Sequence, residues 1–336
     1  MILASFITPT LNAEKVLADC LKSISIQTIK NYEIIIADGG STDSTLAIAK
    51  SFNAKIFKNP LKTSEAGKAV SIRHAKGKYL VFLDSDNLLP SKNWLKKMLW
   101  PLQKDPQIIG SEPIRFTYRP SAGFIERYSA LIGANDPYAY ISGIYDRYSY
   151  LSDKWTNLKI KTQDFPDYLK IKLNPDQAIP TIGANGAIFR NDFFKKYFHG
   201  DYFFDIDIIT SVLHQTHQPL YFAKVKIGII HTFCEASIKK FIRKQKRRII
   251  DFYQFQNQRK YDWQKNNRFA TIKFSLYTLT LIPPVFDSFR GYFKKPDFAW
   301  FFHPLACLIS FFVYFSATLK NVIGQKNIID RSHWQQ

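Results

Sequence analysis

Two aspartates separated by one residue follow a short apolar run in the sequence YLVFLDSDNLLP, residues 79–90. A continuous apolar run of this length is typical of a buried strand, so Asp84 and Asp86 should leave the sheet together at the end of that strand. Neighbouring carboxylates repel each other unless a cation or hydrogen-bond donors neutralise them. The pair therefore predicts a divalent metal that holds a diphosphate, with two solvated loop acids as the alternative.

A second polar cluster follows another apolar run in the sequence EIIIADGGSTDST, residues 33–45. The strand should end at Asp38, the two glycines allow a tight turn, and Ser41, Thr42 or Asp43 can cap the next helix. Doubly wound sheets bind nucleotides at such strand–turn–helix junctions. An ordinary turn with a helix cap is the alternative interpretation.

The first hundred residues alternate between short apolar runs and segments with helical spacing. The apolar runs cover residues 2–7, 33–37 and 79–83. Because these runs are continuously apolar, they indicate parallel strands that are covered on both faces. The rhythm of strand, helix and strand predicts an α/β doubly wound domain with right-handed crossovers.

This rhythm is lost between residues 113 and 180, which are rich in Tyr, Asp, Pro and Lys. There we expect a helix near residues 121–133, followed by long loops over the sheet edge. Regular structure should return with TIGANGAIFR (181–190), a helix around 204–217 and a strand in 223–230.

Four motifs occur in a characteristic order along the chain: PTLNAE (9–14), DGGSTDST (38–45), EAGKA (65–69) and DSD (84–86). Together they resemble the motifs of a family 2 glycosyltransferase of GT-A fold, over roughly residues 1–235. The resemblance implies a nucleotide-diphospho-sugar transferase with a Rossmann-like mixed sheet. It divides the catalytic domain into a nucleotide-sugar-binding half (1–112) and an acceptor half (113–235).

The resemblance also implies roles for individual residues of the donor half. The first loop would line the nucleoside pocket, Asp38 would contact the base, and Lys68 would lie near the diphosphate. Asp84 and Asp86 would order the ribose and a Mg2+ or Mn2+ ion, with Asp86 as the more direct ligand. The implied nucleotide-sugar-binding residues are Pro9, Thr10, Asn12, Glu14, Asp38, Gly40, Ser41, Lys68, Asp84, Ser85 and Asp86.

Downstream, GANGAIFR (183–190) resembles the acceptor-side turn of the family, which implies that Gly183, Asn185 and Gly186 lie near the reacting sugar. FFDIDII (203–209) resembles the motif that supplies the catalytic base, although Phe204 stands where the family has Glu. Asp205 is the preferred candidate base and Asp207 the second; either could instead start a helix. His231, at the end of a strand, is a third candidate metal ligand, although a lone histidine there is more often structural.

The sequence Gln245-Lys246-Arg247-Arg248-Ile249 resembles a relaxed QxxRW motif. Ile249 replaces the Trp that helps to hold the glucan in processive relatives, so the resemblance does not favour a processive synthase. Arg247 and Arg248 are candidate acceptor-side phosphate contacts, and basic side chains that face a membrane are the alternative.

Composition limits the class of protein. The chain has 336 residues, of which 46% are hydrophobic and 16% aromatic, which excludes a mainly disordered protein. Its net charge of +20 predicts a negatively charged partner. Three widely spaced cysteines predict neither a disulfide framework nor a zinc site. The N-terminal sequence lacks a basic n-region, so we expect a first strand rather than a signal peptide, and a cytoplasmic catalytic domain.

Much of this charge is concentrated in one segment. Residues 239–268 contain eleven Lys or Arg and two Asp, with apolar residues at helical spacing. The pattern predicts a basic amphipathic interface helix over residues 236–268 that faces anionic lipid. A solvated helix that packs its apolar face on the domain is the alternative.

Two apolar segments follow in residues 269–336, which we expect to form a membrane-associated helical hairpin and tail. Phe298–Leu319 has 22 residues without a formal charge, which is long enough to cross a bilayer. Phe269–Phe286 is a weaker candidate because it contains Lys273 and the pair Pro283–Pro284. One span with an interfacial helix, and two buried helices of a soluble subdomain, are the alternatives.

These features predict an inverting, metal-dependent glycosyltransferase at the cytoplasmic face of the cell membrane. Its donor would be a nucleotide-diphospho-sugar and its acceptor a lipid-linked glycan or a polysaccharide. A polyprenyl-phosphate sugar synthase is the alternative enzyme. A basic membrane-peripheral or nucleic-acid-binding protein on a degenerate scaffold is the non-enzyme alternative. No nucleic-acid-binding motif occurs in the sequence, so we expect no nucleic acid partner.

Overall fold

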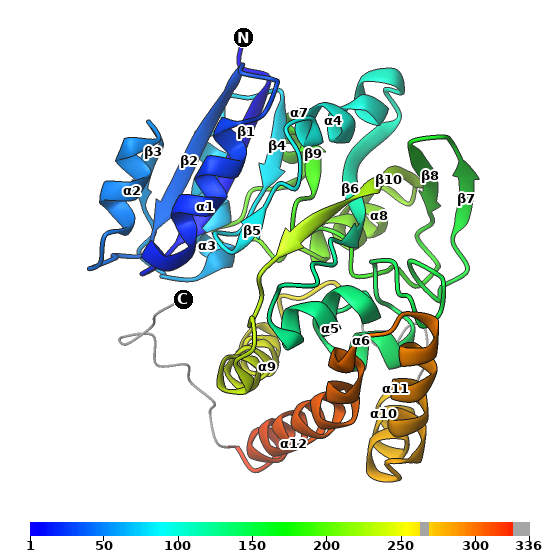
Figure 1. The fold of residues 1–336 in the computed structure, drawn as a ribbon. Coiled ribbons are helices and arrows are strands. Elements are labelled where there is room, and N and C mark those ends of the chain that lie inside the picture. The colour runs from blue at the N-terminus through cyan, green and yellow to red at the C-terminus, as the bar shows by residue number, and fades with distance from the viewer. Residues whose placement is uncertain (263–268, 325–336) are drawn as a thin grey trace.

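A computed structural model describes residues 1–262 and 269–324. A large mixed sheet runs through the domain in the order β3-β2-β1-β4-β9-β6-β10-β8-β7, with β5 paired to β10 (Figure 1). Its strands are β1 (Ala4–Thr10), β2 (Tyr32–Asp38), β3 (Lys55–Lys58), β4 (Tyr79–Phe82), β5 (Asn87–Leu88), β6 (Ile108–Phe116), β7 (Lys161–Asp164), β8 (Tyr168–Leu173), β9 (Ile188–Arg190) and β10 (Leu220–His231).

The strands of the amino-terminal half are parallel. β1 pairs with β2 from Ala4 opposite Tyr32 to Thr10 opposite Asp38, and its other edge pairs with β4. β9 is antiparallel to both β4 and β6, and it lies between them in the sheet. Because β1, β2 and β4 run in the same direction, the polar residues that follow them meet at one edge of the sheet.

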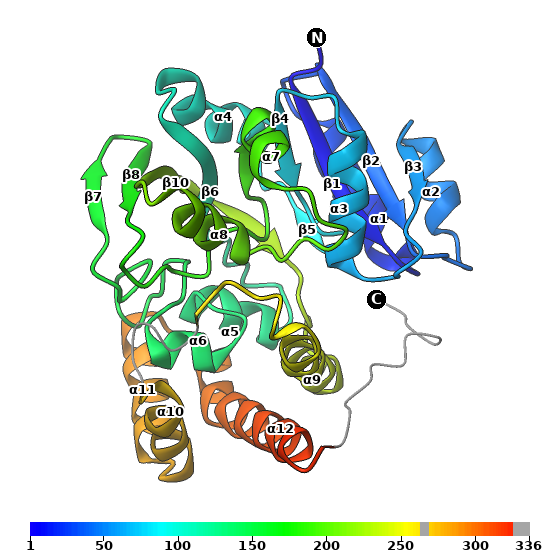
Figure 2. The ribbon, with the colours of Figure 1, turned by 180° about the vertical axis from the view of Figure 1, so that it is seen from behind.

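Helices cover both faces of the sheet (Figures 1 and 2). Side chains alternate along β2: Ile34 and Ile36 pack into the cluster with α1, α2 and α4, whereas Ile35 packs into the cluster with α3, α7 and α8. This arrangement confirms the predicted doubly wound domain. The helices are α1 (Glu14–Ser25), α2 (Thr45–Ser51), α3 (Ser64–His74), α4 (Trp94–Lys104), α7 (Asn191–Tyr197) and α8 (Asp207–Thr216).

A separate helical layer lies beyond the sheet domain, in the lower part of Figure 1. Its own apolar cluster includes the buried side chains of Phe241, Trp300 and Phe302. Its elements are α5 (Phe124–Ile132), α6 (Pro137–Ser142), α9 (Ile238–Phe255), α10 (Ala270–Leu279), α11 (Ile282–Lys294), the 3-10 helix η1 (Phe298–Phe302) and α12 (His303–Val322).

The segment predicted to be irregular contains more regular structure than expected. The predicted helix near residues 121–133 is present as α5, but the end of β6, the helix α6 and the hairpin of β7 and β8 were not predicted. Glu112 and Pro113 interrupt the apolar pattern by which β6 could have been recognised in the sequence. Glu112 is nevertheless fully buried, because its carboxylate is paired with a cation inside the protein.

The basic helix is shorter than predicted. α9 ends at Phe255, where the amides of Gln258 and Arg259 turn back to the Phe255 carbonyl. Residues 256–262 then form a non-helical strap over the start of α8, because Arg259 binds Asp207 there. The remainder of the predicted helix, residues 263–268, lies outside the described residues.

The weaker apolar segment does not form a continuous helix. α10 ends at Leu279 and α11 begins at Ile282, with Leu281 in a left-handed conformation (φ +60°) between them and prolines in the first turn of α11. In the described part of the chain one helix is long and apolar enough to cross a membrane, Phe298–Val322, with a mean hydropathy of 1.7 and 39% of its apolar window buried. The predicted tail from residue 325 onward lies outside the described residues.

Candidate active site

A cavity of about 910 Å³ lies at the strand ends, between the sheet domain and the helical layer. Residues that follow β1, β4 and β10 contribute to its wall, as do α6, α9, α10 and α12. Of the residues predicted from sequence, those that line it are Asp84, Ser85, Asp86, Asn185, Asp205, His231, Arg247 and Arg248. The acids that follow β4 and the basic side chains of α9 thus face one space.

Asp38 organises the turn that follows β2. Its Oδ2 accepts hydrogen bonds from the backbone amides of Gly40 (2.9 Å) and Ser41 (2.8 Å), and its Oδ1 accepts from the hydroxyls of Ser41 (2.6 Å) and Thr10 (3.0 Å). Gly40 has φ +94°, which favours glycine. Asp38 is buried, so the described contacts use it to shape the loop, and its predicted contact with a base stays a prediction.

The first loop and this turn bind each other. The Asn12 side chain accepts a hydrogen bond from the Thr42 amide (2.9 Å), and the Glu14 carboxylate accepts one from the Ser44 amide (3.1 Å). The cavity is lined instead by Leu11, Lys15 and Val16, which are sequence neighbours of the predicted loop residues. The predicted residues Pro9, Thr10, Asn12 and Glu14 therefore build the loop, while their neighbours face the cavity.

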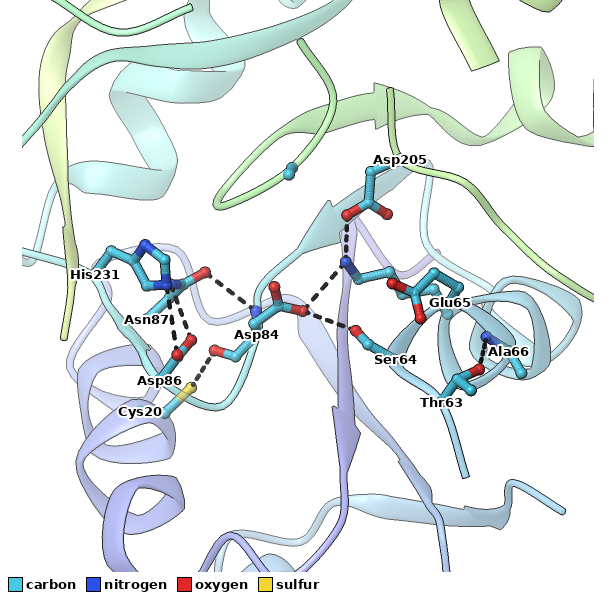
Figure 3. Close-up of polar contacts among 12 residues, drawn as sticks. Cys20, Thr63, Ser64, Glu65, Ala66, Asp84, Asp86, Asn87, Asp205 and His231 are labelled. Atoms are coloured by element: carbon cyan, nitrogen blue, oxygen red, sulfur yellow. Dashed lines mark hydrogen bonds and ion pairs between the residues drawn. The ribbon is translucent and has the colours of Figure 1, made fainter. Parts of the chain in front are cut away.

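Asp84 and Asp86 have different partners, and Asp86 points toward His231 (Figure 3). Asp84 Oδ1 lies 3.2 Å from Lys68 Nζ, whereas Asp86 Oδ2 lies 2.9 Å from Lys244 Nζ and 3.4 Å from His231 Nε2. Burial opposes ionisation of Asp86, but Lys244 and His231 outweigh it and hold the pKa of its carboxyl well below the usual value. Protein side chains therefore neutralise the pair in this structure, and the predicted divalent metal stays a prediction.

Lys68 joins residues that are far apart in the sequence, Asp84 and Asp205. It lies on α3, its side chain is 2% exposed, and its Nζ contacts Asp205 Oδ2 at 2.6 Å as well as Asp84 (Figure 3). Two carboxylates around a buried ammonium raise the pKa of Lys68 despite its burial, so it stays charged. The helix that carries Lys68 starts at Thr63, whose hydroxyl accepts a hydrogen bond from the Ala66 amide (3.0 Å).

Asp205 has the properties of a proton acceptor. Burial raises the pKa of its carboxyl to about 7, with Asp84 adding to the rise and Lys68 opposing it. Its Oδ1 is buried and makes no hydrogen bond. A carboxylate with one free oxygen and a pKa near neutrality is suited to general base catalysis.

Asp207, the second candidate base, is engaged in a structural contact. Its Oδ1 accepts from Arg259 Nη2 (2.7 Å), and its Oδ2 accepts from Arg259 Nε (3.0 Å) and from the Lys260 amide (2.7 Å). The arginine also lies over the Phe204 ring. Asp207 thus holds the strap of residues 256–262 against α8, and this geometry favours Asp205 as the base.

The loop of residues 183–186, which was predicted to lie on the acceptor side, packs against Asp205. A Cβ atom on Gly183 would lie 2.2 Å from the Asp205 carbonyl oxygen, and Gly183 has φ +132°, so only glycine fits. Asn185 (φ +45°) and Gly186 (φ +84°) also have left-handed backbones. Asn185 lines the cavity, whereas Gly183 and Gly186 shape the loop.

A buried ionic network that the sequence did not reveal holds this loop. Arg147 donates to the carbonyls of Ala184 (3.1 Å) and Asn185 (3.2 Å) and pairs with Glu112 (2.6 Å). Lys224 also contacts Glu112, at 2.8 Å. Glu112, Arg147 and Lys224 are at most 1% exposed. The acidic residue Glu112 inside an apolar strand could have indicated a buried ion pair. Its partners could not be identified, because they lie 35 and 112 residues away in the sequence.

Arg248 and Arg247 of α9 both line the cavity, as does Ile249. Arg248 donates to Gln245 Oε1 (2.5 Å) and lies 3.5 Å from Asp136 Oδ2, which also accepts from the Tyr314 hydroxyl of α12 (2.6 Å). The relaxed QxxRW segment therefore lies where α6, α9 and α12 meet. Lys244, the residue before this segment, was not predicted as a site residue.

The sequence is similar to those of known glycosyltransferases. Residues 5–121 match the family model Glycosyl transferase family 2. A PGL/p-HBAD biosynthesis glycosyltransferase of Mycobacterium bovis is 35% identical over 100 residues, which are 28% of this chain and 39% of that protein. A poly(ribitol-phosphate) beta-glucosyltransferase of Bacillus spizizenii is 33% identical over 101 residues, 27% of this chain and 16% of that protein. The chain spans less than half the length of these curated relatives.

The fold is similar over nearly the whole chain to that of a solved glycosyltransferase. The mannosyltransferase PcManGT from Pyrobaculum calidifontis, in complex with GDP-Man and Mn2+, matches with a TM-score of 0.50 at 14% identity, over 96% of this chain and 87% of that chain. The mixed sheet, its two helical layers and the site at the strand ends define a GT-A fold. Within it, residues 5–121 are similar to glycosyl transferase family 2, whose model they match.

Proposed function

We propose that the protein is an inverting glycosyltransferase that uses a nucleotide-diphospho-sugar donor. The observation that carries this proposal is the chain of contacts from Asp84 through Lys68 to Asp205. It connects the donor-side motif to a candidate base across a cavity that is large enough for a small-molecule ligand. The family match and the GT-A fold favour the same reaction class.

A divalent metal fits the residues at Asp86. A carboxylate oxygen and an imidazole nitrogen face one position, and both are groups that Mg2+ or Mn2+ accepts. Within residues 1–262 and 269–324 no group of three or more His, Cys, Asp or Glu side chains is gathered for a metal, so donor phosphates and water would complete the shell. When bound, Mg2+ or Mn2+ would supply positive charge for the leaving diphosphate. PcManGT, which was solved with Mn2+ and GDP-Man, is consistent with such a requirement.

The reaction forms a bond between an acceptor oxygen and the anomeric carbon, and breaks the bond from that carbon to the donor phosphate. The bonding electron pair leaves with the nucleoside diphosphate. Asp205 takes the proton of the acceptor hydroxyl, and Lys68 holds this base close to the donor-side acid Asp84. A phosphate acceptor is already ionised and would need no strong base.

We further propose that the acceptor is a lipid-linked glycan or a polysaccharide, met at a membrane. The cavity that contains Asp84 and Asp86 is also lined by Thr271 of α10 and by Tyr314 and Thr318 of α12. The relatives support an envelope acceptor by name, since one is named for PGL/p-HBAD biosynthesis and the other for poly(ribitol-phosphate). A polyprenyl phosphate fits the same cavity as an alternative acceptor.

The outer surface of the C-terminal helices supports a membrane location. Phe286, Phe293, Phe312 and Phe315 are 58–80% exposed, in a surface whose acids Asp287 and Asp297 are paired within the protein. At 1.5 Å per residue, α10 and α11 are roughly 15 and 20 Å long, which is less than the ~30 Å hydrocarbon core. We propose that they enter one leaflet, on the same side as the catalytic domain.

The test is a screen of nucleotide-sugars with the full chain and vesicles. Release of nucleoside diphosphate is measured with Mg2+, with Mn2+ and with EDTA, with and without polyprenyl phosphate. We expect turnover of one donor that requires a divalent metal and is lost in Asp86→Ala. Full turnover in EDTA, or in that variant, would contradict the metal site. Absence of turnover with every donor would contradict the proposed reaction.

A further inference from the structure

Lys244 contacts Asp86, and both residues line the cavity. Its Nζ lies 2.9 Å from Asp86 Oδ2 and 3.0 Å from the Phe233 carbonyl oxygen, and it lies over the Phe233 ring at 4.6 Å from the centroid. The side chain is 23% exposed and lines the cavity, so it has open space on one side. His231 approaches the same carboxylate oxygen at 3.4 Å.

Lys68 and Lys244 neutralise the two acids in different ways. Lys68 is 2% exposed and lies between Asp84 and Asp205, so moving it would leave two carboxylates without their cation. Lys244 contacts one carboxylate and is partly open to the cavity. Because a lysine head is a point charge on a flexible four-carbon stem, Lys244 can swing while its helix stays in place.

Lys244 is not needed to hold α9. Phe241 and Gln245 of the same helix are fully buried, and the Gln245 side chain donates to the Asn135 carbonyl (3.0 Å). Ser237 caps the first turn by accepting from the Lys240 amide (3.2 Å). The ion pair with Asp86 therefore has another consequence: it places a protein cation where a metal would have to bind.

We propose that Lys244 is a binding residue for the donor diphosphate, and that it occupies Asp86 until a divalent cation displaces it. This inference rests on the proposed nucleotide-sugar reaction. A cation at Asp86 and the ammonium of Lys244 would repel each other at contact distance. A diphosphate that arrives with the cation offers new oxygen partners in the same cavity, so the ammonium exchanges one anionic partner for another. A metal ion that binds without a diphosphate must instead displace Lys244 while the ammonium gains no new anionic partner.

Two binding measurements test the exchange without relying on turnover. The first titrates the full chain with MnCl2 alone and follows free Mn2+ by electron paramagnetic resonance. The second titrates it with UDP or GDP at saturating Mn2+ by calorimetry. The variants are Lys244→Gln, Lys244→Arg as a charge-preserving substitution, and Lys239→Gln as the matched control on the exposed side of α9.

We expect opposite changes in Lys244→Gln. Mn2+ alone should bind on the order of tenfold more tightly, because no ammonium then competes for Asp86, whereas the nucleoside diphosphate should bind on the order of tenfold more weakly. Lys244→Arg should keep the weak Mn2+ affinity of the wild type, and Lys239→Gln should change neither constant.

The outcomes separate this inference from the proposed function. Unchanged or weaker Mn2+ binding in Lys244→Gln, or equal tightening in Lys239→Gln, would overturn the exchange whatever the nucleotide does. Tighter Mn2+ binding with unchanged nucleotide binding would overturn the diphosphate role of Lys244. If neither UDP nor GDP binds the wild type, the proposed donor class fails, and the Mn2+ titration still decides whether Lys244 competes for Asp86.

Discussion

In the sheet domain charged side chains lie inside and are paired, whereas in the C-terminal helices large apolar side chains lie outside and are exposed. Glu112 and Lys224 are fully buried, but Phe286 is 64% and Phe293 80% exposed. Buried charges fix the positions of loops at a cost in desolvation, which suits a site that must hold its geometry. Exposed apolar side chains on neighbouring helices indicate a partner that is not water. The first region holds the candidate site, and we propose that the second meets a membrane.

The largest effect should come from the buried acid in the sheet domain. Asp205→Asn should lower kcat by about 10²–10⁴-fold, because the amide cannot accept the acceptor proton. In the wild type the rate should rise with pH through about 7 and level off above it, since the pKa of Asp205 is raised to about 7 and the ionised form is the base. Asp201→Asn, at an 89% exposed acid nearby, is the control. A wild-type rate that is flat from pH 5 to 9 would contradict this assignment.

The next largest effect concerns the buried network around Arg147. Arg147→Met leaves the carbonyls of Ala184 and Asn185 without their donor and Glu112 with Lys224 as its remaining cation, and should lower the free energy of unfolding by about 3–5 kcal/mol. Arg73→Gln breaks the exposed pair with Asp201 and should cost about 1 kcal/mol or less. Urea unfolding at pH 7 measures both. Equal losses of unfolding free energy in the two variants would mean that the buried ion pairs stabilise the sheet domain no more than an exposed pair does.

A third prediction concerns the exposed apolar side chains of the C-terminal helices, which we propose contact a membrane. The double variant Phe286→Glu with Phe293→Glu should float with anionic vesicles at least tenfold less than the wild type, because each buried phenyl ring is worth about 1.5–3 kcal/mol. Its thermal unfolding in buffer should change little, since both side chains are exposed. Ile26→Glu, at a 52% exposed position on the sheet domain, is the matched control. Full flotation of the double variant would place the membrane contact elsewhere.

The smallest effect concerns the helix that carries Lys68. Thr63→Ala removes the cap of α3 and should cost about 1 kcal/mol of stability, which thermal denaturation can measure. Thr42→Ala, at an exposed turn residue, should cost less. A larger loss at Thr42 would show that the turn after β2, rather than α3, limits the stability of the donor half.

The sequence predicted the donor half well because its signals are local. Apolar runs, helix spacing and turn residues lie within segments of about fifteen residues, and they located β1, β2, β4 and the junctions after them. The motif order then gave the family. In contrast, β6 was missed because Glu112 interrupts its apolar pattern, and its partner Lys224 is 112 residues away.

The candidate site was predicted in part for the same reason. Asp84, Asp86 and Asp205 follow recognisable motifs, and they line one cavity. Lys244 lies in a run of basic residues in which no local feature distinguishes one side chain from the next; it is tertiary packing that aims it at Asp86. Asp207 and Arg259 could not be paired from sequence either, so α9 was predicted to continue where the chain instead turns back toward α8.

The wall that α10 and α12 contribute to the cavity has a kinetic consequence. With the apolar face of these helices on a bilayer, a lipid-borne acceptor and the enzyme would share one surface, and their encounter would become a search in two dimensions. Confinement raises the effective concentration of the acceptor far above its bulk value. The rate would then follow the surface density of acceptor in the vesicle rather than its total amount, so diluting the acceptor with inert lipid should slow turnover while adding buffer should not.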